Sequence, residues 1–95
     1  MPETETGVRE RIHAFVLSTF PAAAARGVSD DDSLLSSGVL DSLGILQLAT
    51  FLEQEFRLIV QDDELSGDNF DTIAALTRYV TGKQASANAK RASSA

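Results

Sequence analysis

The sequence predicts an all-α fold, a four-helix bundle with three main helices, one short helix and a long loop between the first two. Three segments carry apolar residues at the spacing of one helix face. The β-branched run at 58–60 has no partner segment that would make it a strand, so we expect an extended connector there. A chain of 95 residues suits a single domain with a small core.

The first helix is expected from Thr6, as a candidate N-cap, to Phe20. Pro21 ends it, because proline lacks a backbone donor and disfavours a helical residue before it. The four alanines at 22–25 either extend this helix or form a short turn of their own. The apolar stripe consists of Val8, Ile12, Phe15, Val16 and Phe20.

Residues 21–41 show no sustained period and form the long loop, a length that is often functional. Its acids, Asp30 to Asp32, are read as a solvated run. The second helix should run from Ser42 to Phe56 with Asp41 as its N-cap. Gly44 and Gln47 are placed on its exposed side. The apolar face is expected to comprise Leu46, Leu48, Ala49, Leu52 and Phe56, widened by Leu43, Ile45 and Phe51.

Beyond the connector, Asp62 or Asp63 is expected to cap a short helical turn that reaches Leu65, and Phe70 to fill a buried position. The last helix is capped by Asp71 or Thr72, carries Tyr79 half-buried with its hydroxyl in water, and ends at Gly82 as a left-handed cap. We therefore assign 1–81 to one domain and 82–95 to a disordered tail.

Charge is distributed unevenly along the chain. The net charge is −6, which divides into −9 over residues 1–81 and +3 over 82–95. An acidic body disfavours nucleic acid and anionic membranes and favours basic patches on protein partners. The sequence has no cysteine and one histidine, His13, so we expect no metal site. No long apolar run or basic leader is present, and we expect a cytoplasmic monomer.

The most informative segment is Asp41-Ser42-Leu43, at the start of the strongest helix. The first N–H groups of a helix lack intrahelical acceptors and the helix dipole is positive there. A phosphate attached to Ser42 would therefore lie in a favourable field. Asp-Ser at a helix start is also ordinary capping chemistry, so this segment alone does not identify a function.

Three further motifs accompany it: Glu53-Gln54-Glu55-Phe56, Asp62-Asp63-Glu64-Leu65 and Asn69-Phe70-Asp71-Thr72-Ile73. With these motifs, 8–80 resembles the acyl carrier and peptidyl carrier family. The resemblance implies that Ser42 receives 4′-phosphopantetheine from coenzyme A through a magnesium-dependent transferase, with Asp41 and Leu43 beside it. The arm then bears its cargo as a thioester, and the carrier itself catalyses nothing.

The resemblance also implies that partner enzymes, such as a synthase, acyltransferase or ligase, dock on the helix after the serine. That places Gly44, Gln47, Glu53 and Glu55 at the docking surface. Because Gly44 and Gln47 stand where fatty acid carriers usually have acids, the pattern looks more like stand-alone carriers of polyketide or other secondary-metabolite pathways.

Three alternatives remain open. The cargo is an aminoacyl group, including D-alanyl; or the chain is an unmodified acidic docking module; or it is a hydrolase that uses Ser42 and His13. The last is disfavoured by the lack of a glycine-flanked nucleophile motif.

Overall fold

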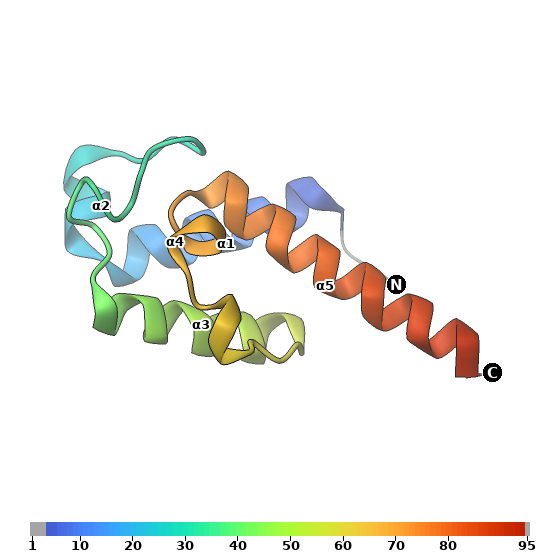
Figure 1. Cartoon of the computed structure of the whole chain (residues 1–95). Helices are drawn as coiled ribbons and strands as arrows, with labels where there is room; N and C mark the ends of the chain where they lie inside the picture. Colours follow the sequence, from blue (N-terminus) through green and yellow to red (C-terminus); the bar gives the residue numbers. More distant parts are fainter. Residues whose placement is uncertain (1–3, 95) are drawn as a thin grey trace.

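A computed structural model describes the backbone of residues 4–94 and the side chains of 4–86. The described chain is all-helical, which confirms the predicted fold class (Figure 1). The elements are α1 (Glu5–Thr19), α2 (Pro21–Arg26), α3 (Ser42–Phe56), the 3₁₀ turn η1 (Asp62–Glu64), α4 (Gly67–Phe70) and α5 (Ile73–Ser94).

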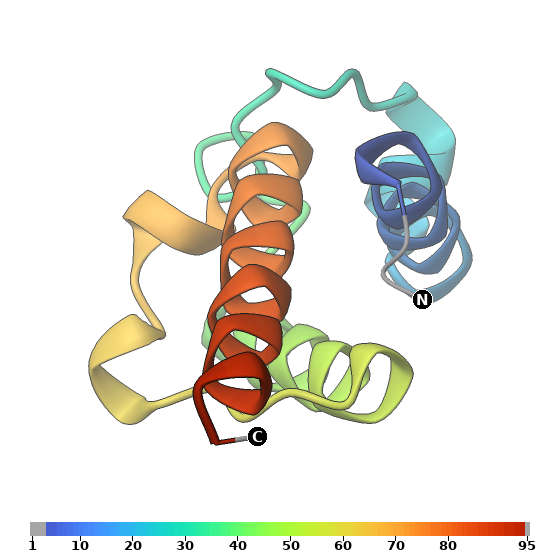
Figure 2. The same cartoon turned by 90° about the vertical axis from the view of Figure 1, so that its right-hand side faces the viewer.

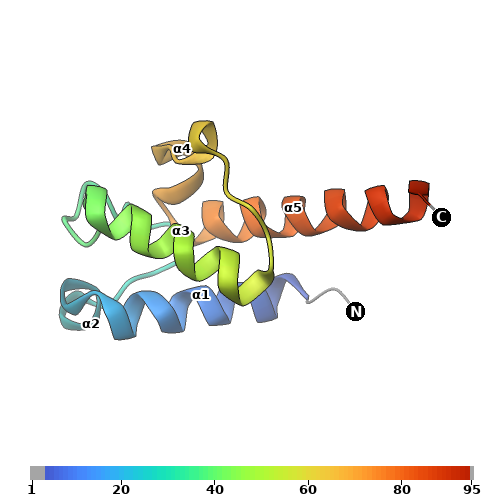
Figure 3. The ribbon, with the colours of Figure 1, turned by 90° about the horizontal axis from the view of Figure 1, so that it is seen from below.

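The three long helices enclose the core. Helices α1 and α5 lie side by side, and α3 crosses both of them, as Figures 2 and 3 show. Between them lie buried apolar side chains from every long helix, together with Leu34, Val39 and Leu40 of the long loop and Phe70 of α4. The loop is thus part of the core, and its apolar residues fix where α3 begins.

Helix α1 begins earlier than predicted. Its N-cap is Thr4, whose hydroxyl oxygen accepts a hydrogen bond from the Gly7 N–H at 3.0 Å, and Thr6 lies inside the first turn. The helix ends at Thr19, and Phe20 turns the chain so that Pro21 occupies the first position of α2. The alanines therefore belong to a short helix of their own.

Helix α3 has the predicted bounds and ends at Arg57, which adopts the left-handed conformation with φ 54°. The connector after it is extended. Glu53 stabilises this turn, since its carboxylate accepts the Val60 N–H at 3.1 Å. Leu58 and Val60 of this connector are half-buried, whereas Ile59 is 68% exposed.

Of the two caps after the connector, one differs from the expected residues and one agrees with them. Gln61, rather than Asp62 or Asp63, caps η1 through a reciprocal pair of side-chain bonds with Glu64. Phe70 is fully buried, as predicted. Thr72, one of the two residues proposed for α5, accepts the Ala75 N–H at 2.9 Å.

Helix α5 does not end at Gly82. It continues to Ser94, and Lys83, expected in the tail, donates to Glu64 at 2.9 Å. A single glycine in an exposed helix costs only about 1 kcal/mol, which neighbouring turns and the Lys83 contact offset. The disorder predicted for 82–95 stays a prediction, and residue 95 lies outside the described chain. The boundary of the domain after residue 81 stays a prediction.

Candidate functional site

Ser42 is the first residue of α3 and its side chain is exposed. The preceding residue, Asp41, is the N-cap: its Oδ1 accepts the Gly44 N–H at 2.7 Å, and its carbonyl accepts the Ile45 N–H at 2.9 Å. The N–H groups of Ser42 and Leu43 take part in neither bond and, at the start of a helix, have no intrahelical acceptor. An exposed hydroxyl therefore stands beside two N–H donors at the positive end of a fifteen-residue helix.

The long loop that leads to Ser42 is held in place by Asp71, which lies between α4 and α5. Its Oδ1 accepts the Ser33 hydroxyl at 2.6 Å and the Leu35 N–H at 3.1 Å, and its carbonyl accepts the Leu34 N–H at 2.6 Å. Leu34 in turn accepts the Leu40 N–H at 3.0 Å. From the sequence, Asp71 is only a candidate helix cap, because its partners in this positioning role lie 36 and 38 residues away.

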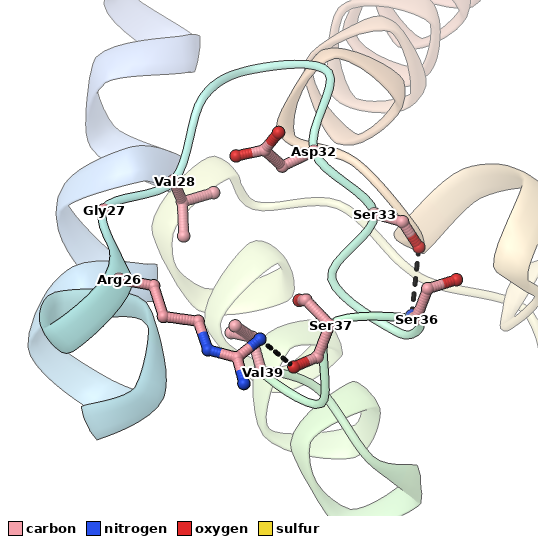
Figure 4. A pocket seen from close by; sticks show the side chains of 8 residues that line it. All are labelled: Arg26, Gly27, Val28, Asp32, Ser33, Ser36, Ser37 and Val39. Carbon is pink, nitrogen blue, oxygen red and sulfur yellow. Dashed lines mark hydrogen bonds between the residues drawn. The ribbon is translucent and has the colours of Figure 1, made fainter.

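A second tie comes from Arg26 at the end of α2. Its guanidinium donates to the Ser37 carbonyl at 2.6 Å (Figure 4). The next residue, Gly38, has φ 80°, a conformation that other residues adopt only with strain. The chain can therefore turn sharply from the loop into Val39, Leu40 and the start of α3.

Gly44 is not where the sequence analysis placed it. It is buried, and a Cβ at this position would lie 2.9 Å from Leu40 Cδ1 and 3.2 Å from Phe20 Cε1. The glycine lets the loop and the end of α1 pack closely against the first turn of α3. It does not present a surface to a partner. Its spacing of four from Leu48 and eight from Leu52, both fully buried, was the signal that could have shown this.

The exposed face of α3 is instead built from residues assigned to the apolar face. Leu43 is 65% exposed and Leu46 is 55% exposed. Gln47 is exposed, as predicted, and Thr50 and Gln54 continue the same stripe along the helix. We call these five residues, Leu43, Leu46, Gln47, Thr50 and Gln54, the uncharged stripe. It begins directly after Ser42.

The two glutamates expected at the docking surface make contacts within the protein. Glu53 is half-buried and holds the connector through Val60, as described above. Glu55 forms an ion pair with Arg11 of α1, whose guanidinium also lies 4.9 Å from the centre of the Phe56 ring. Both carboxylates therefore stabilise the far end of α3.

The remaining polar groups have structural contacts. His13 Nε2 lies 3.1 Å from the Val28 carbonyl, which only accepts, so this nitrogen carries the proton. Asp30 pairs with Arg9 at 3.5 Å. The Asp32 carboxylate accepts the Ser29 N–H, and the hydrogen bonds from Ser29 lower the pKa of Asp32.

Glu64 is the centre of a cluster that fastens η1 to α5. Its Oε1 accepts from the Gln61 N–H at 2.9 Å, the Tyr79 hydroxyl at 3.0 Å and Lys83 Nζ at 2.9 Å. The bond from Gln61, followed by the one from Lys83, lowers the pKa of Glu64. Burial, together with the bond to Glu64, raises the pKa of Tyr79. The Tyr79 hydroxyl thus bonds to protein, whereas water was expected.

Two negative findings apply to the described residues. No group of three or more histidine and acidic side chains is arranged to hold a metal ion within residues 4–86. Over the described helices, none combines the length and apolar character that crossing a bilayer requires.

The exposed serine at the start of α3, beside helix N–H groups without intrahelical acceptors, suits a covalently attached phosphate-linked group. Residues 11–80 match the family described as "Phosphopantetheine attachment site". The chain belongs to this family of phosphopantetheine-bearing carrier proteins. Such proteins carry acyl groups and do not catalyse reactions, which excludes the alternative of a hydrolase that uses Ser42 and His13.

Curated relatives agree with this assignment. The chain is 32% identical over 71 residues to the D-alanyl carrier proteins of Streptococcus pyogenes serotypes M5 (strain Manfredo), M49 (strain NZ131) and M1. The alignment covers 73% of this chain and 90% of each relative. The expected family and its 4′-phosphopantetheine cofactor are thus confirmed, whereas the preference for a polyketide pathway finds no support in these relatives.

The start of α3 suits that cofactor. The Ser42 oxygen is exposed, and the N–H groups of Ser42 and Leu43 are available to a phosphate on it. Asp41 is committed to capping through Oδ1 and so keeps the first turn formed. When bound, phosphopantetheine supplies the thiol that this cysteine-free chain lacks.

Proposed function

We propose that Ser42 carries the phosphopantetheine arm and that the arm presents an aminoacyl thioester, with D-alanine as the first candidate cargo. The observation that carries the first part is the exposure of Ser42 at the first position of α3, inside the matched residues 11–80. The aminoacyl part rests on the similarity to D-alanyl carrier proteins. Because coenzyme A and aminoacyl adenylates are cytoplasmic, we place the protein in the cytoplasm.

Attachment is tested by incubating the purified protein with coenzyme A, magnesium and a promiscuous phosphopantetheinyl transferase, followed by intact mass measurement. One phosphopantetheine unit should be added to the wild type and none to Ser42→Ala. Ser36→Ala is the matched control, because Ser36 is also exposed and near the start of α3 but lies in the loop. The proposal would be contradicted if Ser42→Ala gained the phosphopantetheine unit, or if the folded wild type did not gain it.

Cargo is tested on the modified protein. A ligase that activates D-alanine with ATP should load the arm, whereas malonyl or acetyl transferases of polyketide synthesis should load it at least tenfold more slowly. The opposite order would favour the polyketide reading. A protein that accepts the arm but neither cargo would leave the carrier role intact and refute D-alanine.

We further propose that partner enzymes dock on the uncharged stripe. Leu43 and Leu46 offer exposed apolar area within a turn of the attachment point, whereas the acids of α3 are engaged elsewhere. Apolar anchors at the centre of a small interface carry most of its binding energy. The proposed docking surface therefore includes Gln47. It does not include Gly44, Glu53 or Glu55.

A further inference from the structure

A surface pocket of about 430 Å³ lies between the end of α2 and the long loop (Figure 4). This size falls within the range of small-molecule sites. Val28 and Val39 form its apolar part, and Arg26, Asp32, Ser36 and Ser37 supply polar groups around it. None of the roles described above for Ser42 or the uncharged stripe uses this pocket.

The walls of the pocket are preformed, because hydrogen bonds hold each of them. Arg26 bridges to the Ser37 carbonyl at 2.6 Å, and the Ser36 N–H donates to the Ser33 hydroxyl at 3.0 Å (Figure 4). Asp32 Oδ2 accepts the Ser29 N–H at 2.9 Å. A ligand would therefore meet an ordered site with little loop entropy left to lose.

The pocket lies within reach of an arm on Ser42. Val39 precedes Ser42 by three residues, so their Cα atoms are separated by at most about 11 Å. A phosphopantetheine arm has about fourteen bonds from the serine oxygen to its sulfur, close to five extended residues or about 17 Å. An arm folded back over Leu40 and Asp41 can thus place its thiol end in the pocket.

The chemistry of the pocket suits an aminoacyl end. The Arg26 N–H groups that do not bond to Ser37, together with the Ser36 hydroxyl, match the amide carbonyls of the arm. Asp32 is the carboxylate among the lining residues, and it lies across the pocket from the Arg26 guanidinium in Figure 4. The bond from Ser29 keeps the pKa of Asp32 low, so Asp32 is ionised at neutral pH and attracts an ammonium group.

We propose that this pocket is a resting site for the loaded arm, in which the ammonium group of an aminoacyl thioester lies beside Asp32 and Val28 and Val39 contact the adjoining carbon atoms. The proposal rests on the aminoacyl function proposed above. A neutral acyl group lacks the charge that Asp32 attracts, so the pocket discriminates between the two cargo classes.

The experiment uses stable amide analogues of the loaded arm, installed on Ser42 from the corresponding coenzyme A derivatives by the promiscuous transferase. One analogue carries an alanyl group with a free amine, and the other carries a propionyl group, which has the same carbon chain without the amine. Backbone amide shifts of the two forms are compared with those of the unloaded arm. The alanyl arm should shift the amides of residues 26–39 at least twice as far as the propionyl arm does.

Asp32→Asn provides the variant, because asparagine still accepts the Ser29 N–H through its amide oxygen while losing the charge. It should reduce the alanyl shifts to the propionyl level. Asp31→Asn, an exposed neighbour outside the pocket lining, should leave them unchanged. Equal shifts for the two arms, shifts confined to 41–46, or equal effects of the two variants would overturn the proposal.

This test separates the two levels of inference. The analogues reach Ser42 without a native ligase, so a failed transfer would count against Ser42 attachment. A successful transfer with no response at 26–39 would count against the pocket alone.

Discussion

Asp71 offers the sharpest test of how the fold positions the attachment site. Asp71→Ala removes the carboxylate oxygen that accepts both the Ser33 hydroxyl and the Leu35 N–H. A hydrogen bond to a charged group contributes about 1.5–3 kcal/mol when buried. Because Leu35 is exposed and Ser33 half-buried, water replaces part of each bond, and we expect a total loss of about 2 kcal/mol. For a domain of this size, that lowers Tm by roughly 8–16 °C.

The loss is measured by urea and thermal denaturation of the unmodified protein. Asp68→Ala is the matched control, since it removes the same charge from an exposed side chain of α4. Hydrogen exchange should accelerate across residues 33–40 in Asp71→Ala only. If the two variants agree within about 0.5 kcal/mol, the carboxylate does not hold the loop, and Ser42 is positioned by the core packing of the loop alone.

Three further predictions follow from other contacts. Gly44→Ala should destabilise the folded protein by about 1 kcal/mol, because the clash with Leu40 exceeds the gain in helix propensity. Gly82→Ala should stabilise it by about 0.5–1 kcal/mol, because the added methyl group lies in open space. Urea denaturation measures both changes. The bonds to Glu64 lower its pKa, so their contribution to stability is complete above about pH 4.5 and is lost as the pH falls through the lower pKa of the folded state. Glu64→Gln should therefore flatten the acid part of a plot of Tm against pH. Leu46→Ala should lower the rate of cargo loading about fivefold or more without changing Tm by more than about 2 °C, since the side chain is largely exposed.

Each of these has its own control. A left-handed cap at Gly82 would make alanine destabilising there, which would contradict the continuous helix. Asp68→Asn should leave the acid part of the Tm profile unchanged. If Asp68→Asn and Glu64→Gln flatten the profile equally, the titration of Glu64 is not the cause of the pH dependence. Thr50→Ala, at the far part of the uncharged stripe, should slow loading less than Leu46→Ala; a reversed order would move the docking centre away from Ser42.

Local signals are enough to predict the bounds of helix α3. Asp41 is a strong N-cap, and the apolar spacing from Leu48 to Phe56 has the period of a helix, so no distant contact was needed. The error lay in which side chains face inward. The apolar side chain of Leu46 suggests the buried face and the resemblance suggests an exposed Gly44, although the spacing from Leu48 places Gly44 on the buried side.

Other features depend on contacts between distant segments. Asp71 lies 38 residues from Ser33, and nothing local distinguishes a loop anchor from a helix cap. Just after Gly82 in α5, Lys83 bonds to Glu64, 19 residues earlier in the chain. Glycine at a helix position is a weak stop signal by itself, because its cost of about 1 kcal/mol is within reach of one such contact.

The uncharged stripe has a consequence for the behaviour of the protein at high concentration. Exposed leucines on one helix face would let two copies associate through the same surface. The net charge of −6 opposes this, because like-charged molecules repel before short-range apolar contact begins. This repulsion is screened by salt, with a Debye length of about 8 Å at physiological ionic strength. The acidity of the body thus opposes self-association through the proposed docking surface, and concentrated carrier should self-associate more readily as salt is raised.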